Sequence, residues 1–114
     1  KLILKLIAEF KIKGLCHITG GGITENLPRV LPPGTAAQIE QNSWSRPAIF
    51  DWIQQQGDVA EDEMLRVFNC GVGMAIIVPA EQLDAVIKAC QVEDMNATQI
   101  GYIISSDDAA HVKY

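Results

Sequence analysis

The sequence predicts the α+β fold class, with a mixed β-sheet and helices packed on it. Apolar residues recur at helical spacing within the first ten residues and again over residues 81–90. Short apolar runs bounded by glycine or proline, typical of strands, lie between the helical segments. Because the two kinds of segment intermix without an internal repeat, a low-complexity tract or a linker, we expect a single domain over residues 1–114.

Helices and strands are expected to follow one another along the chain. Helices are expected over residues 2–10, 43–56, 61–68 and 81–90, a short helix or turn over residues 23–31, and strands over residues 14–19, 35–39, 73–78, 98–104 and 111–114. Ser43 or Ser45 is expected to cap the helix that ends at residue 56. Its inward face would consist of Ile49, Phe50 and Ile53. No residue before the first helix could cap it, so we expect the chain to be part of a longer protein.

The chain is acidic, with a formal net charge of -5. Its basic residues are scattered, so its field would repel nucleic acid and anionic membranes, and neither is expected as a partner. No apolar run reaches the roughly 18 residues that a membrane-spanning helix needs. A small phosphorylated ligand is compatible with this charge, because backbone amides can hold a phosphate group.

The three cysteines, Cys16, Cys70 and Cys90, form an odd and widely spaced set. They cannot all pair with one another, and they lack the spacing of a zinc site. The residues that would bind a metal ion therefore stay unknown from the sequence. Each cysteine lies beside apolar residues, which predicts buried free thiols in a reducing compartment. We therefore expect the protein to be cytoplasmic.

The segment over residues 17–29 holds the strongest candidate site. An apolar strand runs into three glycines, Gly20, Gly21 and Gly22, and then into the start of a helix. Glycine lets the backbone approach a ligand closely, and the free amides of a helix start attract anions. Thr19 adds a hydroxyl group, so the pattern predicts phosphate binding by Thr19 and the three glycines. A plain flexible turn is the alternative, because the pattern matches neither the P-loop nor the dinucleotide-binding sequence.

Three further polar residues lie in or beside the glycine-containing segments. His17 directly precedes the loop in an otherwise apolar strand. It is either a hydrogen-bonded core residue, the commoner case, or a group that transfers a proton or contacts a phosphate. Asn26 follows the glycines, and Asn69 belongs to a second glycine-containing stretch over residues 68–74. The Asn69 amide could hydrogen-bond the loop or a substrate amide, although packing explains the two glycines of this stretch, Gly71 and Gly73, about as well as a ligand does.

Two blocks of the sequence resemble a known family. The segment HITGGGITENLPRVLP, residues 17–32, closely resembles a signature of the aminoimidazole ribonucleotide synthetase family. The segment FNCGVGM, residues 68–74, with Glu63 and Arg66 before it, is similar to a second block of that family. The resemblance extends in order over nearly the whole chain.

The resemblance implies a two-domain enzyme, with this chain as its C-terminal domain and the N-terminal domain absent. Members of the family form homodimers through their N-terminal domains. They use ATP and Mg²⁺ to convert formylglycinamidine ribonucleotide to aminoimidazole ribonucleotide. The formyl amide oxygen takes the γ-phosphoryl group, an amidine nitrogen attacks the same carbon, and phosphate leaves as the ring closes. We therefore expect a cyclo-ligase of purine biosynthesis whose C-terminal domain is inactive alone.

The same resemblance implies roles for the candidate residues. His17 would transfer a proton or stabilise the developing oxyanion, and Thr19 with residues 20–22 would hold a phosphate of the substrate or nucleotide. Asn26 and Asn69 would orient the substrate. Two alternatives stay open. One is a domain that binds a phosphorylated ligand without catalysis. The other is a sister synthetase acting on thiamine phosphate, selenide or formylglycinamide ribonucleotide. The Asn-Leu-Pro-Arg stretch after the glycines favours the cyclo-ligase.

Overall fold

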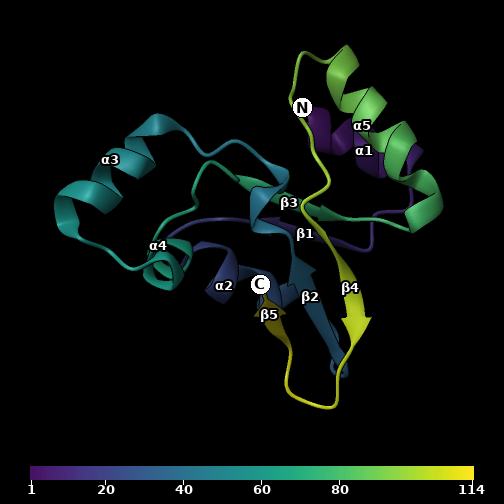
Figure 1. Ribbon diagram of the computed structural model, residues 1–114. Helices are drawn as coiled ribbons and strands as arrows, with labels where there is room; N and C mark the ends of the chain where they lie inside the picture. Colours follow the sequence, from purple (N-terminus) through teal and green to yellow (C-terminus); the bar gives the residue numbers. More distant parts are fainter.

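Helices and strands follow one another along residues 1–114 in the computed structural model (Figure 1). The helices are α1 (Leu2–Glu9), α2 (Gly22–Asn26), α3 (Ala48–Gly57), α4 (Glu61–Val67) and α5 (Leu83–Val92). The strands are β1 (Gly14–His17), β2 (Thr35–Ile39), β3 (Met74–Ile77), β4 (Gly101–Ser105) and β5 (His111–Lys113). Short 3-10 turns cover Leu27–Val30, Gln41–Ser43 and Ala80–Gln82. None of the helices combines the length and the apolar composition needed to cross a membrane.

The strands form two sheets, whereas the sequence analysis expected one mixed sheet. β1 pairs antiparallel with β3, and β2 lies at the centre of a second sheet, antiparallel to β4 and parallel to β5. The sheets pack face to face rather than edge to edge. Cys16 and Ala75 of the first sheet share one buried cluster with Ala37 and Ile39 of the second. The α+β class is confirmed, with one antiparallel and one mixed sheet.

The main core lies between the two sheets. Its buried residues are Cys16, Ile18, Ile23, Leu27, Leu31, Ala37, Ile39 and Ala75. Ile18 precedes the three glycines and Ile23 follows them, and both side chains are almost fully buried. The segment over residues 19–22, which we call the glycine loop, is therefore anchored in the core at each of its ends.

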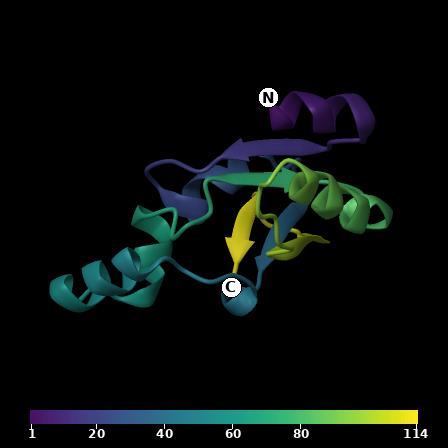
Figure 2. The ribbon, with the colours of Figure 1, turned by 90° about the horizontal axis from the view of Figure 1, so that it is seen from above.

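α1 lies on the side of the β1–β3 sheet away from β2 (Figure 2), and it packs with α5 in a second apolar cluster. Leu6 of α1 is buried with Val86 and Cys90 of α5, and Ile76 of β3 packs against this cluster. The helical spacing of apolar residues in residues 2–10 predicts such a buried face. The β1–β3 sheet thus separates the main core from a second, smaller core.

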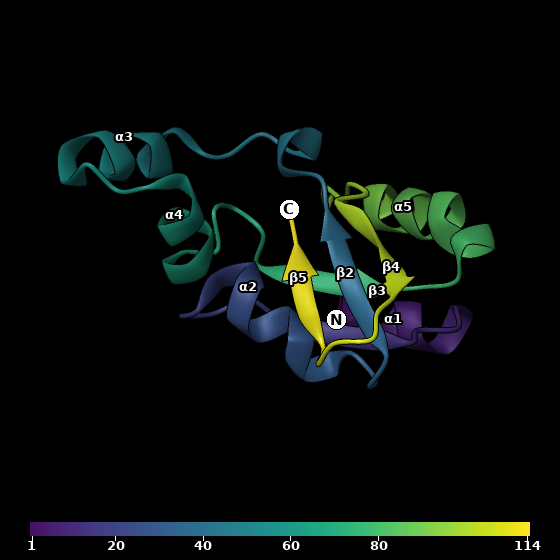
Figure 3. The same ribbon diagram turned by 60° about the horizontal axis from the view of Figure 1, so that its bottom comes forward.

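α3 and α4 form a helical hairpin that projects from the two sheets (Figure 3). Met64 and Leu65 of α4 are buried, whereas α3 buries none of its residues. Phe50 and Ile53 of α3 pack against the α4 cluster, as predicted. The prediction for Ile49 is wrong, because its side chain is 55 % exposed. α3 contacts the α4 cluster along a narrow stripe of its surface, and Ile49 lies outside this stripe.

The start of α3 also differs from the prediction. The helix begins at Ala48, and neither Ser43 nor Ser45 caps it. A residue that precedes proline avoids the helical region, so the helix cannot extend back past Pro47 to either serine. The Ser43 hydroxyl donates instead to the Glu40 carbonyl oxygen at 2.6 Å, within a 3-10 turn.

β5 forms the predicted edge strand and brings residue 114 against α2. It runs parallel to β2, with His111 opposite Ala36. The Tyr114 hydroxyl oxygen lies 2.6 Å from Thr24 Oγ1. Because the Thr24 hydroxyl donates to the Leu65 carbonyl oxygen at 3.3 Å, Tyr114 donates to Thr24. A chain of hydrogen bonds therefore joins residue 114, α2 and α4.

Leu6 and Leu4 test the second core, because they lie on one helix with opposite exposure. Leu6→Ala should lower the free energy of unfolding by about 2–5 kcal/mol, since it removes a side chain that is 1 % exposed. Leu4→Ala, at a position 72 % exposed, should change it by less than about 0.5 kcal/mol. Urea denaturation followed by circular dichroism measures both variants, and equal losses would contradict the assigned faces of α1.

Candidate functional site

The glycine loop is shaped by a close backbone contact with α4. Gly21 and Gly22 have φ values of 99° and 57°, in the left-handed region that favours glycine. Gly22 is buried, and a Cβ atom there would lie 2.1 Å from the Leu65 carbonyl oxygen and 2.6 Å from that of Phe68. No side chain fits in this space. Gly22 therefore lets α2 pack directly on the end of α4.

The rest of the loop leaves its amides open. Gly20 is exposed, and a Cβ atom there would meet nothing within 4 Å. Among the amides of residues 20–24, only that of Gly22 donates a hydrogen bond within the chain, to the Thr19 carbonyl oxygen at 3.1 Å. The amides of Gly20 and Gly21, two residues that keep exposed surface, have no partner within the chain. Packing therefore explains Gly22, whereas the open amides of Gly20 and Gly21 fit the predicted phosphate site.

Asn26 supports the loop from beneath and is 4 % exposed. Its Nδ2 donates to the carbonyl oxygens of Gly22 at 2.8 Å and Gly20 at 3.2 Å. Its Oδ1 accepts from Thr19 Oγ1 at 3.3 Å. Because both polar atoms of the amide have partners in the loop, Asn26 fixes the position of residues 19–22. A direct contact between Asn26 and a substrate stays a prediction.

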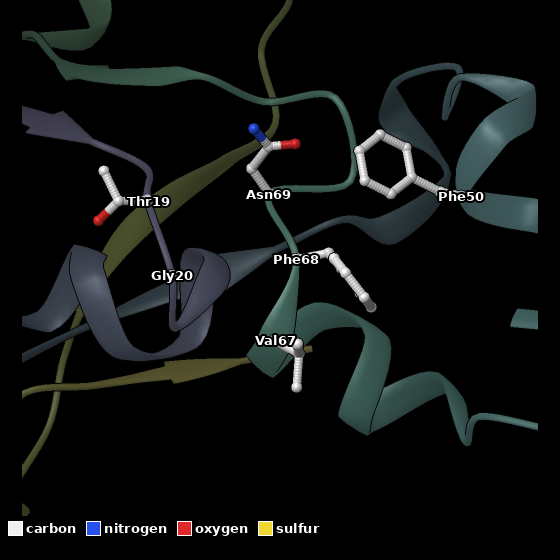
Figure 4. Close-up of a pocket in the computed structure, with 6 residues that line it drawn as sticks. All are labelled: Thr19, Gly20, Phe50, Val67, Phe68 and Asn69. Carbon is white, nitrogen blue, oxygen red and sulfur yellow. The ribbon is translucent and has the colours of Figure 1, made fainter. Parts of the chain in front are cut away.

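An open pocket of about 310 Å³ lies between the glycine loop and the α3–α4 hairpin (Figure 4). Its walls are formed by Thr19, Gly20, Phe50, Val67, Phe68 and Asn69. Three predicted site residues, Thr19, Gly20 and Asn69, thus come together from two distant segments. The apolar wall of Phe50, Val67 and Phe68 was not predicted. Only Phe68 could have been found from the sequence, because it directly precedes Asn69 in the segment over residues 68–74.

Asn69 has an unused donor at this pocket. Its Oδ1 accepts from the Gly71 amide at 2.9 Å, while its Nδ2 has no partner within the chain. The turn that follows requires Gly71, whose φ is 96° and whose Cβ would lie 2.5 Å from Pro47 Cδ. Glycine at position 71 thus serves packing against the start of α3, and Nδ2 of Asn69 is available to a ligand.

His17 lies on the surface at the end of β1. Its neighbours Cys16 and Ile18 are buried, and strand alternation turns the exposed His17 side chain to the opposite face, beside its partner Met74. The alternative that His17 is a core residue is therefore wrong. His17 does not line the pocket, and its proposed catalytic role stays a prediction.

A polar cluster joins α3 to α4 beside the pocket. Arg46, just before α3, forms an ion pair with Glu61 at the start of α4. Gln54 of α3 donates to Glu61 Oε2 at 2.9 Å, and its own Oε1 accepts from Arg46 at 3.4 Å. The hydrogen bond from Arg46 lowers the pKa of the Glu61 carboxyl group, and the same bond raises the pKa of Arg46. We call these three residues the Arg46 clamp.

The side chains of this chain do not form a metal site. No group of three or more His, Cys, Asp or Glu residues is arranged to hold a metal ion. Cys16, Cys70 and Cys90 are buried free thiols, as predicted, and burial raises the pKa of each.

Open amides, the Asn69 donor and the apolar wall together form a site suited to a small ligand with an anionic group. Over residues 1–113 the chain matches the family described as AIR synthase related protein, C-terminal domain. The chain therefore belongs to this family, as the resemblance of residues 17–32 and 68–74 implied.

Several curated relatives carry the name phosphoribosylformylglycinamidine cyclo-ligase. The protein of Methylobacillus flagellatus is 50% identical over 103 residues, which cover 90% of this chain and 30% of that protein. The protein of Bordetella pertussis is 50% identical over 97 residues, covering 85% of this chain and 28% of its own length. The protein of Cupriavidus pinatubonensis is 48% identical over 103 residues, which cover 90% of this chain and 29% of that protein. The chain thus spans less than a third of the length of these relatives.

Gly22 and Gly20 form a matched pair for testing the loop. Gly22→Ala should destabilise the fold by more than about 2 kcal/mol, because the new Cβ would overlap carbonyl oxygens at a left-handed backbone position. Gly20→Ala should cost less than about 1 kcal/mol, since its Cβ would enter open space. Chemical denaturation compares the two variants. A Gly22→Ala protein as stable as the parent would refute the backbone contact.

The Arg46 clamp should make stability depend on pH. A carboxyl group whose pKa is lowered by folding stabilises the protein above its unfolded pKa of 4.5 and loses this effect as pH falls through the lower folded value. Glu61→Gln should therefore lower the melting temperature at pH 7 by about 1–4 °C, a small effect because the carboxylate is nearly half exposed. The difference in melting temperature between Glu61→Gln and the parent protein should shrink between about pH 5 and pH 3.

Glu63→Gln, on the same helix but outside the clamp, is the control for this measurement. It should leave the melting temperature nearly unchanged at pH 7, because the Glu63–Arg66 pair is exposed. A loss in Glu61→Gln that stays constant across the acidic range would show that the ion pair is not its cause.

Proposed function

We propose that this chain is the substrate-binding C-terminal domain of a phosphoribosylformylglycinamidine cyclo-ligase, an ATP-dependent ligase of purine biosynthesis. The pocket beside Gly20 carries this proposal, since it joins phosphate-type donors to an apolar wall in a chain half identical to proteins of that name. The chain spans less than a third of those relatives, so the activity is proposed for the longer protein. This domain is proposed to be inactive alone.

The proposed reaction closes formylglycinamidine ribonucleotide to aminoimidazole ribonucleotide. The formyl amide oxygen attacks the γ-phosphorus of ATP, and ADP leaves. An amidine nitrogen then attacks the activated carbon, and the carbon–oxygen bond breaks to release phosphate. These steps require the reacting groups to be held in line and the developing charge to be stabilised by fixed donors.

The glycine loop is proposed to hold the phosphate group of the substrate. Thr19 Oγ1 already donates to Asn26, so the donors available to a phosphate are the amides of Gly20 and Gly21 and Nδ2 of Asn69. Thr19 contacts the ligand as part of the pocket wall. Amide donors can hold the phosphate despite the net charge of -5, because they act at short range.

The remaining requirements are proposed for the longer protein. ATP and Mg²⁺ are its cofactors, and the Mg²⁺ ligands are proposed to lie in the N-terminal domain, as the family resemblance implies. The homodimer is likewise assigned to that domain. Three buried free thiols are consistent with a reducing compartment, and we propose the cytoplasm.

His17 is proposed to transfer a proton or to stabilise the developing oxyanion. It lies directly before the glycine loop and is exposed, so its imidazole is open to a ligand that extends over the outer face of β1. In the full-length protein, His17→Asn should lower kcat by about 10²–10⁴-fold if the imidazole transfers a proton in the slow step. Stability should change by less than about 0.5 kcal/mol, because the side chain is on the surface.

His111→Asn is the matched control, since it changes the other histidine of the chain at a distant strand. Steady-state kinetics on the three proteins, with a thermal melt of each, separates chemistry from folding. Near-normal kcat in His17→Asn would remove the catalytic role. Turnover also decides between the alternatives, because a sensor domain would bind a phosphorylated ligand without turnover, and a sister synthetase would prefer another substrate.

A further inference from the structure

The pocket has two walls of different chemistry and different origin. The polar wall consists of Thr19, Gly20 and Asn69, and it holds the open donors. The apolar side consists of Phe50 from α3 and of Val67 and Phe68, which lie where α4 ends and directly precede Asn69. Figure 4 shows the segment of Val67, Phe68 and Asn69 between Gly20 of the glycine loop and the Phe50 ring. A volume of about 310 Å³ is in the range of sites for whole small molecules, roughly 300–1,000 Å³.

The two aromatic rings form a continuous apolar surface. The centroids of Phe50 and Phe68 lie 6.1 Å apart, with their planes tilted by 60°. This arrangement is typical of attractive aromatic pairs, so the rings stabilise each other's position. Neither ring is fully buried, and both residues line the pocket.

Phe50 depends on few interactions for its position. α3 buries no residue, and only Phe50 and Ile53 connect it to the apolar cluster of α4. The Arg46 clamp is the polar connection between the two helices, and the Arg46 side chain in it is only 16% exposed. Without the clamp, the distance between Phe50 and Phe68 would rest on Phe50, Ile53 and the contact of Pro47 with Gly71.

We propose that Phe50 is a specificity-determining residue for the non-phosphate part of the ligand, and that Arg46 is the positioning residue that holds it there. The inference rests on the proposed function, whose substrate joins a phosphoribosyl group to a formylglycinamidine group. With its phosphate on the loop amides, this ligand lays its formylglycinamidine group toward the aromatic wall. Amide and amidine groups are flat, and a protonated amidine is a cation, so both pack favourably on the face of an aromatic ring.

The first experiment measures dissociation constants on the full-length protein by calorimetry, with inorganic phosphate, ribose 5-phosphate and formylglycinamidine ribonucleotide. Phe50→Ala should weaken binding of the ribonucleotide by about 10-fold, and binding of phosphate by less than about 2-fold, because only the larger ligand reaches the aromatic wall. Phe50→Leu keeps an apolar side chain without the aromatic ring, and it should restore folding but only part of the affinity. Trp52→Ala, on the exposed side of the same helix, should change neither constant.

The second experiment tests the positioning role by kinetics. Arg46→Gln and Glu61→Gln should each raise the KM for the ribonucleotide by about 5–10-fold, with the KM for ATP and kcat nearly unchanged, because they displace one wall of one pocket. The double variant should add little to either single change, since both remove the same interaction. Lys5→Gln, which breaks an exposed ion pair between α1 and α5 outside the pocket, is the control and should leave all three constants unchanged.

The outcomes separate this inference from the proposed function. If the parent protein neither binds nor converts the ribonucleotide, both fail together. If the parent turns over but Phe50→Ala binds phosphate and the ribonucleotide with unchanged affinity, the inference alone fails. An equal loss for both ligands would also overturn it, because that pattern indicates damage to the loop. Additive effects of Arg46→Gln and Glu61→Gln would refute the positioning role.

Discussion

The contact of Gly22 with the carbonyl oxygens of Leu65 and Phe68 sets the geometry on which the pocket depends. Two backbones meet there with no side chain between them, so the spacing of α2 and α4 cannot vary as it would across flexible side chains. Phe68 and Asn69 follow that contact directly on one side, and Gly20 precedes it on the other. The hydrogen bonds of Asn26 then fix the loop, so the polar wall exists before any ligand arrives.

Local patterns in the sequence predict most of the secondary structure but not how it assembles. The bounds of β2 match the prediction, because a short apolar run between Pro-Pro-Gly and polar residues leaves little choice. The division into two sheets was not predictable, since alternation shows which residues share a face and not which strand they meet. Gly20 and Gly22 are likewise identical in the sequence, and only the approach of α4 gives them different roles.

The candidate site was predictable where its chemistry is local. Thr19, Gly20 and Asn69 lie in segments whose glycines already indicate a close backbone approach in the sequence. Phe50 was assigned to the core because an apolar face turned to a pocket has the same periodicity as one turned to a core. Arg46 and Glu61 resemble ordinary surface charges until the hairpin brings them together. The sequence left two alternatives for His17, a core residue or a catalytic one, because its apolar neighbours concealed the alternation that exposes it.

The pairing of β2 has a consequence for the order in which the chain acquires its structure. Residue 36 pairs with residue 104 on one side and with residue 111 on the other. During synthesis, β2 therefore leaves the ribosome with both edges bare, and it stays so until β4 and then β5 have emerged. Such non-local pairing is slow, and a bare strand edge invites association with other chains. A chain that has formed β2 but not yet β4 and β5 is therefore an aggregation-prone intermediate.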